Sequence, residues 1–516
     1  MSWNYDKSKV RIKKHAGILE EIQIEKLTRE ADLNNLLTET CCREIHGAHV
    51  YVHVSNFAKM ATEKVSDEKE YKRFIQAVHI YQREVARIVE HADKFSGLRV
   101  HFQGAKLHAL FYRPIDKTEK LAIKAFFLQL VLKDFVDDVF NPAFPFHDDF
   151  KVAGGADVGD VRGTRNGSRD DRELLFLGAA ANYAAKIIND AGQFRITKDL
   201  FDALPEKLQE CCDKINDDVY QIQKISQTTL DELLEEYDIP WDREASEKRV
   251  KDDKTNYPLK DVEYSSANSL IDIDLLGITN NKRVLAASIY GDVTGFTAYI
   301  DSADTDDKKK EALKVLHVIR KEMATVVKKD FEGIRVQFQG DRVQGLYHLP
   351  KDNEADIATE AVDAAVGLQS SMEKTIKEVL PEAGHLKLAV GVDLDKTLVT
   401  KLGTHAHRDR ICLGQGVESA AKLEEKCSGG QIGVSKRIYD VLPERLSKHF
   451  SYDNALKCYV AENLTADKVE RAAKAAHAVA GAPAFINSSK KSGIEISHKE
   501  SEDARMVIPA RSYAGE

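Results

Sequence analysis

Residues 289–301 read IYGDVTGFTAYID: an apolar run ends in Asp292, and a turn containing glycine, phenylalanine and threonine follows. An apolar run of this length before a glycine-containing turn predicts a buried β-strand. Residues 50–61, VYVHVSNFAKMA, have the same pattern but carry His53 at the position of Asp292. The comparison predicts one structural unit used twice, with a carboxylate at the strand end of only one copy.

The repeat extends well beyond these two stretches. GLRVHFQGAKLHALFYRP (97–114) aligns without a gap on GIRVQFQGDRVQGLYHLP (333–350), at a separation of 236 residues (333 − 97). The same separation aligns DRELLFLGAAANYAAKI (171–187) on HRDRICLGQGVESAAKL (407–423). Two copies are too few for a solenoid, so the sequence predicts two domains that pair around a pseudo-twofold axis.

Each copy has the pattern of a mixed α/β domain. Apolar runs of strand length alternate with helical patterns, and the alternation around Gly340–Asp341 predicts a hairpin with its tip at that pair. The order strand, helix, hairpin, helix, strand predicts a ferredoxin-like core. The predicted segments are an N-terminal helical segment (1–45), a first domain (46–210), a helical and charged linker (211–281), a second domain (282–464), and a C-terminal helix with a flexible tail (465–516).

Composition narrows the class of protein. A chain of 516 residues is too long to form a single hydrophobic core, so two or more domains are expected. Its content of 43% hydrophobic and 31% charged residues is typical of a soluble globular protein. The net charge of −9 argues against a nucleic-acid partner, and no apolar run is long enough to span a membrane. Seven cysteines without CxxC spacing, and an N-terminus unlike a secretory signal, predict a cytoplasmic protein with reduced thiols.

The second half resembles the catalytic domain of class III nucleotidyl cyclases. The resemblance rests on D-x-x-G-F-T from Asp292, on the G-D hairpin at Gly340–Asp341, and on G-x-x-V-x-x-A-x-x-L from Gly414 to Leu423. It implies two tandem ferredoxin-like cyclase domains that form a pseudo-heterodimer within one chain. It also implies conversion of a nucleoside triphosphate into a 3′,5′-cyclic mononucleotide and pyrophosphate, with two divalent cations, Mg²⁺ or Mn²⁺, as cofactors.

Cyclisation concentrates charge on phosphate oxygens, so two cations about 3.5–4 Å apart require carboxylates that converge from neighbouring strands. Asp292 at a strand end and Asp341 at a hairpin tip can converge in this way, and the resemblance adds Val293 as a third metal-binding residue. The small residues that follow allow backbone N–H groups to approach the triphosphate. The alternative for either aspartate alone is an ordinary Asp–Gly turn. The predicted triphosphate-binding residues are Thr294, Gly295, Phe296 and Thr297.

The first half lacks the two carboxylates. His53 replaces Asp292 and Ala105 replaces Asp341, so this copy cannot hold two cations that prefer carboxylate oxygens. A packed strand histidine is therefore the favoured interpretation of His53 rather than a metal ligand.

The helix after the last motif shows the opposite asymmetry. In the family an Asn and an Arg on this helix act on the ribose and the α-phosphate. Asn182 in the first half matches that Asn, whereas the second half has Glu418; the Arg position is Lys186 or Lys422. If the halves pair head to tail within one chain, one composite site is complete, with Asn182 and Lys186 as catalytic residues, and the other is inactive. A solvated lysine or a surface amide is the alternative for these two residues.

Two family positions select the base, and here they are His101 and Glu173. The Lys–Asp pair of adenylyl members and the Glu of guanylyl members are both absent. This divergence resembles the bacterial anti-phage pyrimidine cyclases, so a signalling cyclase is expected, with cyclic CMP ranked ahead of cyclic UMP. Its partners would be the substrate and an effector that responds to the product. The alternatives are an adenylate cyclase, a catalytically inactive nucleotide-binding sensor, and a polymerase-like palm domain.

Overall fold

A computed structural model describes most of the chain. Of the predicted C-terminal helix and flexible tail (465–516), the part beyond residue 471 lies outside the described residues. The described ranges are 3–63, 67–90, 95–145, 148–166, 173–189, 192–239, 241–404 and 407–471.

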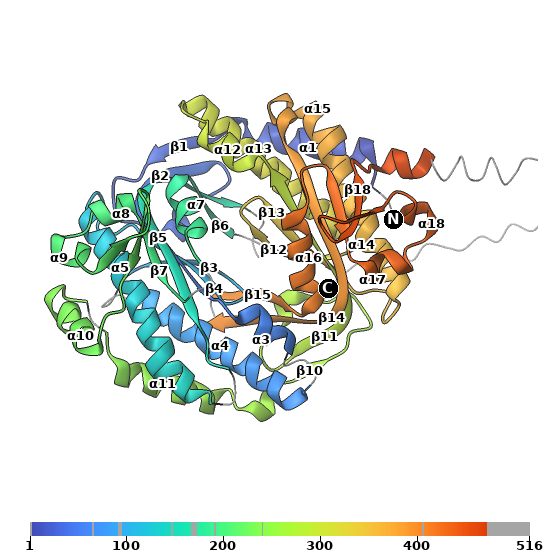
Figure 1. The fold of residues 1–516 in the computed structure, drawn as a ribbon. Coiled ribbons are helices and arrows are strands. Elements are labelled where there is room, and N and C mark those ends of the chain that lie inside the picture. Colours follow the sequence, from blue (N-terminus) through green and yellow to red (C-terminus); the bar gives the residue numbers. More distant parts are fainter. Residues whose placement is uncertain are drawn as a thin grey trace, which may run out of the picture. The chain divides into compact units, whose positions relative to one another are not determined.

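Two sheets share one topology, which confirms the predicted repeat and the mixed α/β class (Figure 1). Their first four strands have the order of a ferredoxin-like core. The first sheet runs β3 (Leu98–Gln103), β4 (Lys106–Phe111), β2 (Cys41–Val54), β5 (Val152–Asn166), β7 (Phe194–Thr197), β9 (Val219–Ile222), β8 (Cys212–Lys214), with β1 (Gln23–Lys26) beside β2 and β6 (Glu173–Leu177) beside β5. The second runs β12 (Ile334–Gln339), β13 (Arg342–Tyr347), β11 (Asn281–Thr294), β14 (Lys387–Thr404), β16 (Gln431–Val434), β18 (Cys458–Glu462), β17 (Ser451–Asp453), with β10 (Tyr264–Ser265) beside β11 and β15 (His407–Leu413) beside β14.

Two long helices in each half bury apolar faces against the sheet, because apolar residues recur at helical spacing along them. Capping fixes where these helices begin. Thr305 accepts a hydrogen bond from the Lys308 N–H before α13 (Asp306–Thr325), and Asn353 accepts one from the Asp356 N–H before α14 (Glu354–Ser370). The first half contains α3 (Phe57–Glu63), α4 (Glu68–Glu90), α5 (Thr118–Asp134), α6 (Asn141–Ala143), α7 (Ala179–Lys186), α8 (Lys198–Asp202) and α9 (Glu206–Gln209). The second contains α12 (Phe296–Asp301), α13 (Asp306–Thr325), α14 (Glu354–Ser370), α15 (Lys377–Val379), α16 (Gln415–Lys426), α17 (Lys436–Val441) and α18 (Glu444–Ser447).

One face of a strand from each half is buried in the core of the other half. Leu175 and Leu177 of β6, from the first half, are buried in the core of the second half. Ile411 and Leu413 of β15, from the second half, are buried in the core of the first. Because β6 and β15 occupy equivalent places in the two sheets, the halves pair within one chain around a pseudo-twofold axis.

The N-terminal segment and the linker differ from the sequence-based expectation. Within the described residues 3–45, the chain is helical only at α1 (Tyr5–Ile18), at a short 3₁₀ turn after it and at α2 (Leu33–Leu36). Strand β1 contains Ile24 and joins the first sheet beside β2. The first sheet also continues beyond residue 210, through β8 and β9. Helix α1 packs on the second half, because Trp3 and Ile12 lie in that core.

The charged stretch of the linker forms a helix that packs on the first half. After α10 (Gln227–Glu236), helix α11 (Arg243–Asn256) begins where Asp242 accepts a hydrogen bond from the Ala245 N–H. Its buried Asp253 receives hydrogen bonds from Arg83 and Arg87 of α4. These charged contacts attach α11 to the first half.

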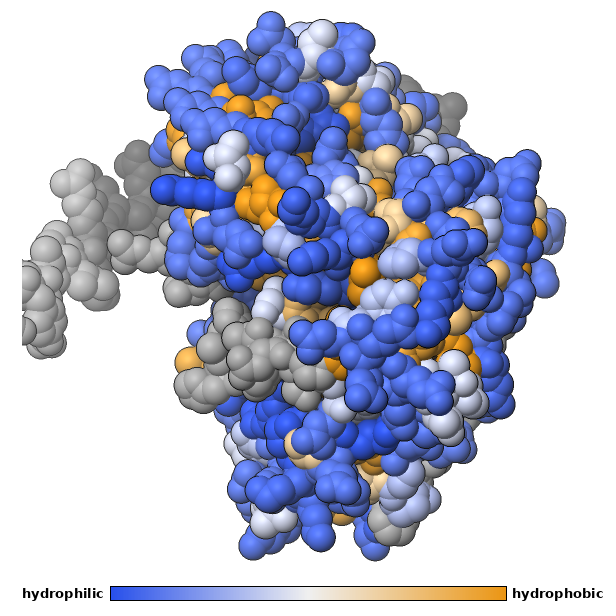
Figure 2. Space-filling model, turned by 90° about the vertical axis from the view of Figure 1, so that its left-hand side faces the viewer, coloured by the Kyte–Doolittle hydropathy of each residue, from blue (hydrophilic) through white to orange (hydrophobic). Residues whose placement is uncertain are grey.

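The molecular face in Figure 2 is mainly hydrophilic, with small hydrophobic patches. None of the helices in the described ranges combines the length and the apolar character that a membrane crossing needs.

Candidate functional site

Asp292 and Asp341 lie at the same end of the second sheet. Strand β11 carries Asp292 next to Gly291, and Gly291 pairs with Val343, which lies two residues after Asp341 on the β12–β13 hairpin. Burial raises the pKa of both carboxyls, and the charge of Asp292 raises the pKa of Asp341 further. The predicted hairpin tip is confirmed, and the two carboxylates interact electrostatically.

The turn after Asp292 combines buried and exposed residues. Thr294, Gly295 and Thr297 are exposed, and Gly295 has a φ of 92°, a left-handed conformation that favours glycine. Phe296 and Val293 are buried in the core of the second half. Only the backbone groups of these two residues can therefore contact a ligand, and the exposed residues leave the turn accessible.

The two aspartates have the chemistry of a Mg²⁺ or Mn²⁺ site. Two carboxylates and the carbonyl of Val293 are hard oxygen donors, which these ions prefer. Within the described ranges, no group of three or more His, Cys, Asp or Glu side chains could hold a metal ion. Magnesium sites in nucleotide enzymes commonly use one or two protein carboxylates plus substrate phosphates, so this donor pair fits a cation that arrives with a triphosphate.

The predicted base-binding residues lie beside the hairpin that carries Asp341. Glu173 of β6 accepts hydrogen bonds from two arginines of the second half: Arg320 Nη2 at 2.7 Å and Arg335 Nη1 at 2.6 Å. Burial lowers the pKa of His101 to about 4, and the charges of Glu173 and Arg320 also act on it. His101 is therefore neutral at pH 7, and its ring nitrogen Nε2 lies 3.1 Å from the amide nitrogen of Gln103.

Asn182 and Lys186 lie on α7, and their positions in the fold match those of Glu418 and Lys422 on α16. The Asn182 N–H donates to the carbonyl of Gly178 at 3.3 Å, and the Glu418 N–H donates to that of Gly414 at the same distance. Asn182 is half-buried, whereas Lys186 is exposed, with Nζ 5.8 Å from the ring centre of Tyr183.

Sheet registers confirm that His53 corresponds to Asp292. Tyr51 on β2 pairs with Gly155 on β5, and Tyr290 on β11 pairs with Gly391 on β14. Two residues further along each strand lie His53 and Asp292. The imidazole Nε2 of His53 lies 3.4 Å from the carbonyl oxygen of Asn189, so this histidine has a protein partner.

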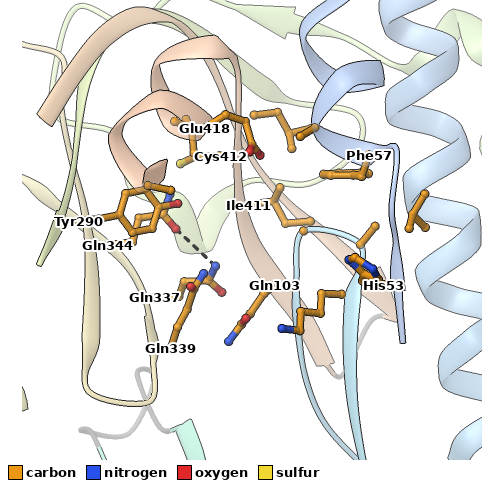
Figure 3. A pocket seen from close by; sticks show the side chains of 18 of the residues that line it. His53, Phe57, Gln103, Tyr290, Gln337, Gln339, Gln344, Ile411, Cys412 and Glu418 are labelled. Atoms are coloured by element: carbon orange, nitrogen blue, oxygen red, sulfur yellow. Dashed lines mark hydrogen bonds between the residues drawn. The ribbon is translucent and has the colours of Figure 1, made fainter. Parts of the chain in front are cut away.

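The expected inactive site is a cavity of about 360 Å³ between the halves (Figure 3). His53 and Ala105 from the first half and Glu418 from the second line it together; Lys422 is not among its lining residues. In Figure 3, Glu418 reaches this cavity from α16, opposite His53, and Gln337 is hydrogen-bonded to Gln344 at 3.4 Å. Under the pseudo-twofold relation of the halves, Asn182 is the counterpart of Glu418, and Asp292 and Asp341 are the counterparts of His53 and Ala105.

Sequence reasoning missed three charged residues near the aspartates. Arg320 donates to the carbonyl of Gly340 at 2.8 Å, next to Asp341. Arg342 pairs with Glu424 at 2.7 Å and lowers the pKa of Asp292, whereas burial raises the pKa of Glu424 to about 7. The sequence signal for Arg320 was an arginine inside an apolar helical stripe, where a charge requires a partner.

Comparison with known proteins agrees with this geometry. Residues 282–469 match the family described as Adenylate and Guanylate cyclase catalytic domain. A uridylate cyclase of Pseudomonas aeruginosa is 30% identical over 95% of this chain and 97% of its own length. A uridylate cyclase of a Rhizobium species is 28% identical over 79% of this chain and 80% of its own.

A solved structure extends the likeness to both halves. The crystal structure of a class III adenylyl cyclase-like ATP-binding protein from Pseudomonas aeruginosa superposes with a TM-score of 0.78 at 26% identity. The superposition covers 92% of this chain and 99% of that one. Together with the repeated fold and the paired aspartates, these matches show that the chain belongs to the class III nucleotidyl cyclase family.

Proposed function

We propose that this cyclase converts UTP into 3′,5′-cyclic UMP and pyrophosphate. The observation that carries the proposal is the complementarity of the halves, because only the second carries the Asp292–Asp341 pair and only the first carries Asn182. The sequence alone favours cyclic CMP over cyclic UMP as the product. The names of the two relatives and the carboxylate of Glu173 both favour uracil instead.

In the proposed reaction, the 3′-hydroxyl oxygen forms a bond to the α-phosphorus, and the bond from that phosphorus to the pyrophosphate oxygen breaks. Asp292, Asp341 and the Val293 carbonyl would hold two divalent cations, and these cations would neutralise the charge that builds up on the phosphate oxygens. The exposed turn Thr294, Gly295 and Thr297, with the backbone of Phe296, binds the triphosphate. The hydroxyl proton leaves to solvent.

The first half positions the nucleotide in this mechanism. Asn182 hydrogen-bonds the ribose and so orients the attacking hydroxyl. Lys186 places a positive charge at the α-phosphate, although it lacks the bidentate fork of the arginine at this family position. Glu418, at the equivalent place in the other cavity, would repel a triphosphate.

Base selection follows from hydrogen-bond complementarity at Glu173. An ionised carboxylate only accepts hydrogen bonds, and uracil presents an N3–H donor where cytosine presents an unprotonated nitrogen. Arg320 and Arg335 occupy one site on each oxygen of Glu173, and a carboxylate has about four lone-pair sites, so an acceptor position remains. Neutral His101 completes this end of the pocket without adding charge.

The test is incubation of the purified protein with equimolar ATP, GTP, CTP and UTP and Mn²⁺, with products identified by mass. Cyclic UMP as the main product is expected. Cyclic AMP as the main product would favour adenylate cyclase, in line with the ATP-binding protein of the solved structure. No cyclic product from any nucleotide would favour an inactive nucleotide-binding sensor.

We also propose that the product is a signal in bacterial anti-phage defence, read by an effector that binds the cyclic nucleotide. The support is the resemblance to cyclases with that role. Expression in a bacterium challenged with phage should protect cells that also carry the effector, and Asp292→Ala should remove the protection.

A further inference from the structure

Arg320 joins the two ends of the site across the interface between the halves. Its side chain is 2% exposed, and it donates to the Gly340 carbonyl at 2.8 Å and to the Glu173 carboxylate at 2.7 Å. The guanidinium group also lies 4.3 Å from the ring centre of Phe338. One buried group thus contacts the hairpin that carries Asp341 and the strand that carries Glu173.

The other interface supplies an internal comparison. Gln82 of α4 donates a hydrogen bond to the carbonyl of Gly104 at 2.6 Å. This bond is the first-half equivalent of the bond from Arg320 to Gly340. Both glycines are in the left-handed region, with φ of 61° and 69°. Within the described ranges, this is the one hydrogen bond that the Gln82 side chain makes. Gln82 therefore does not connect the β3–β4 hairpin to β15.

The arginine is therefore not needed for hairpin folding, because a glutamine satisfies the same carbonyl in the other copy. It is not needed to pair the halves either, because Arg99 and Asp409 pair at 2.6 Å across the other interface without it. What Arg320 adds is the bridge between hairpin and β6, and this bridge occurs on the side that carries Asp341. Gln82 stands on the side that carries Ala105.

We propose that Arg320 is a positioning residue that fixes the metal-binding hairpin relative to the base-reading strand, so that cation binding and base selection depend on one another. The proposal rests on the proposed function, because it assigns metal to Asp341 and base to Glu173. The positioning role is specific to the interface that carries both aspartates. The guanidinium group of Arg320 reaches both the Gly340 carbonyl and Glu173, and a shorter glutamine side chain cannot make both contacts.

The test variant is Arg320→Gln, which installs the residue of the other copy and can keep the hairpin bond. The half-saturating Mn²⁺ concentration should rise more than about tenfold, and the preference for UTP over CTP should fall more than about tenfold, because a 1 Å misplacement can cost about 100-fold in rate. The control is Arg99→Gln, which breaks the Arg99–Asp409 pair across the other interface. Its Mn²⁺ dependence and base preference should stay within about threefold of wild type.

A direct binding readout separates this proposal from the proposed function. The EPR signal of aqueous Mn²⁺ is titrated with protein and with 3′-deoxy-UTP or 3′-deoxy-ATP, which lack the attacking hydroxyl. Weaker Mn²⁺ binding by Arg320→Gln than by Arg99→Gln supports the positioning role even if the wild-type protein cyclises no nucleotide. Arg320→Lys, which keeps the charge, replaces the glutamine variant if that variant does not fold.

Equal Mn²⁺ binding by wild type, Arg320→Gln and Arg320→Lys would overturn the proposal. Equal losses in Arg320→Gln and Arg99→Gln would overturn it too, because they would reflect weaker pairing of the halves rather than a bridge to the metal hairpin.

Discussion

Arg99 Nη1 lies 2.6 Å from Asp409 Oδ2 across one interface between the halves, and this pair repeats the 2.6 Å bond from Arg335 Nη1 to Glu173 Oε1 across the other. Each member is 236 residues from its counterpart (335 − 99 and 409 − 173). The ion pairs that join the halves thus occur at both interfaces. The residues beside them differ, because Ala105 of the first half stands at the position equivalent to Asp341.

This asymmetry predicts unequal effects of mutations at equivalent positions. Asp292→Ala or Asp341→Ala should lower cyclisation by about three orders of magnitude or more, because bound cations supply several kcal/mol of charge stabilisation in the transition state. His53→Ala removes the residue equivalent to Asp292 and should leave activity within a few-fold. Initial rates of cyclic nucleotide formation, with folding checked by circular dichroism, measure the difference; wild-type turnover in either aspartate variant would contradict the metal assignment.

Pairing of the halves within one chain predicts that inactive chains do not complement one another. A mixture of Asp292→Ala and Asn182→Ala chains should remain inactive, since each composite site contains one chain's own two halves. Activity per chain should be independent of protein concentration wherever the chain is monomeric. Recovery of a large share of wild-type activity in the mixture would show that halves pair between chains instead.

The repeat and the positions of the aspartates could be predicted because they depend on local patterns: strand-length apolar runs, Gly–Asp at a hairpin tip, and two copies in register. The packing of one face of β6 and of β15 in the opposite core could not be predicted, because the partners of Leu175 and Ile411 lie in the other half of the sequence. The attachment of α11 to α4 could not be predicted, because the arginines that pair with Asp253 lie far away in the sequence. Arg320 was missed because its bridge depends on tertiary contacts that join three separate segments.

Buried histidines predict loss of stability in mild acid. Burial lowers the pKa of His49 to about 3, of His101 to about 4, and of His108 well below 6.5. As the pH falls below about 6.5, the unfolded chain binds protons at these residues and the folded chain does not. The free energy of unfolding therefore falls by about 1.4 kcal/mol per pH unit for each such histidine. Asp157 and Glu424, whose pKa values burial raises to about 6 and about 7, act in the opposite direction.

A single substitution isolates the histidine contribution. His108→Gln installs the residue that the second half has at the equivalent position, Gln344, which cannot titrate. Urea unfolding at pH 7.5 and pH 5.5 should show a pH slope smaller than that of wild type by about one proton. An unchanged slope would mean that His108 is protonated in the folded protein, contrary to its burial.

The last prediction concerns the base. Glu173→Gln keeps the size of the side chain but adds an N–H donor, which suits the unprotonated ring nitrogen of cytosine and not the N3–H of uracil. The ratio of UTP to CTP turnover should therefore fall, by about ten- to a hundredfold, because a site with an unpaired polar group discriminates strongly against a mismatched edge. Stability should also fall by about 2–5 kcal/mol, since Arg320 and Arg335 lose a charged partner. Asp409→Asn is the matched control: it removes the interface carboxylate that pairs with Arg99, so it should lower stability comparably while leaving the ratio unchanged. Equal shifts of the ratio in both variants would show that Glu173 acts by pairing the halves and not by contacting the base.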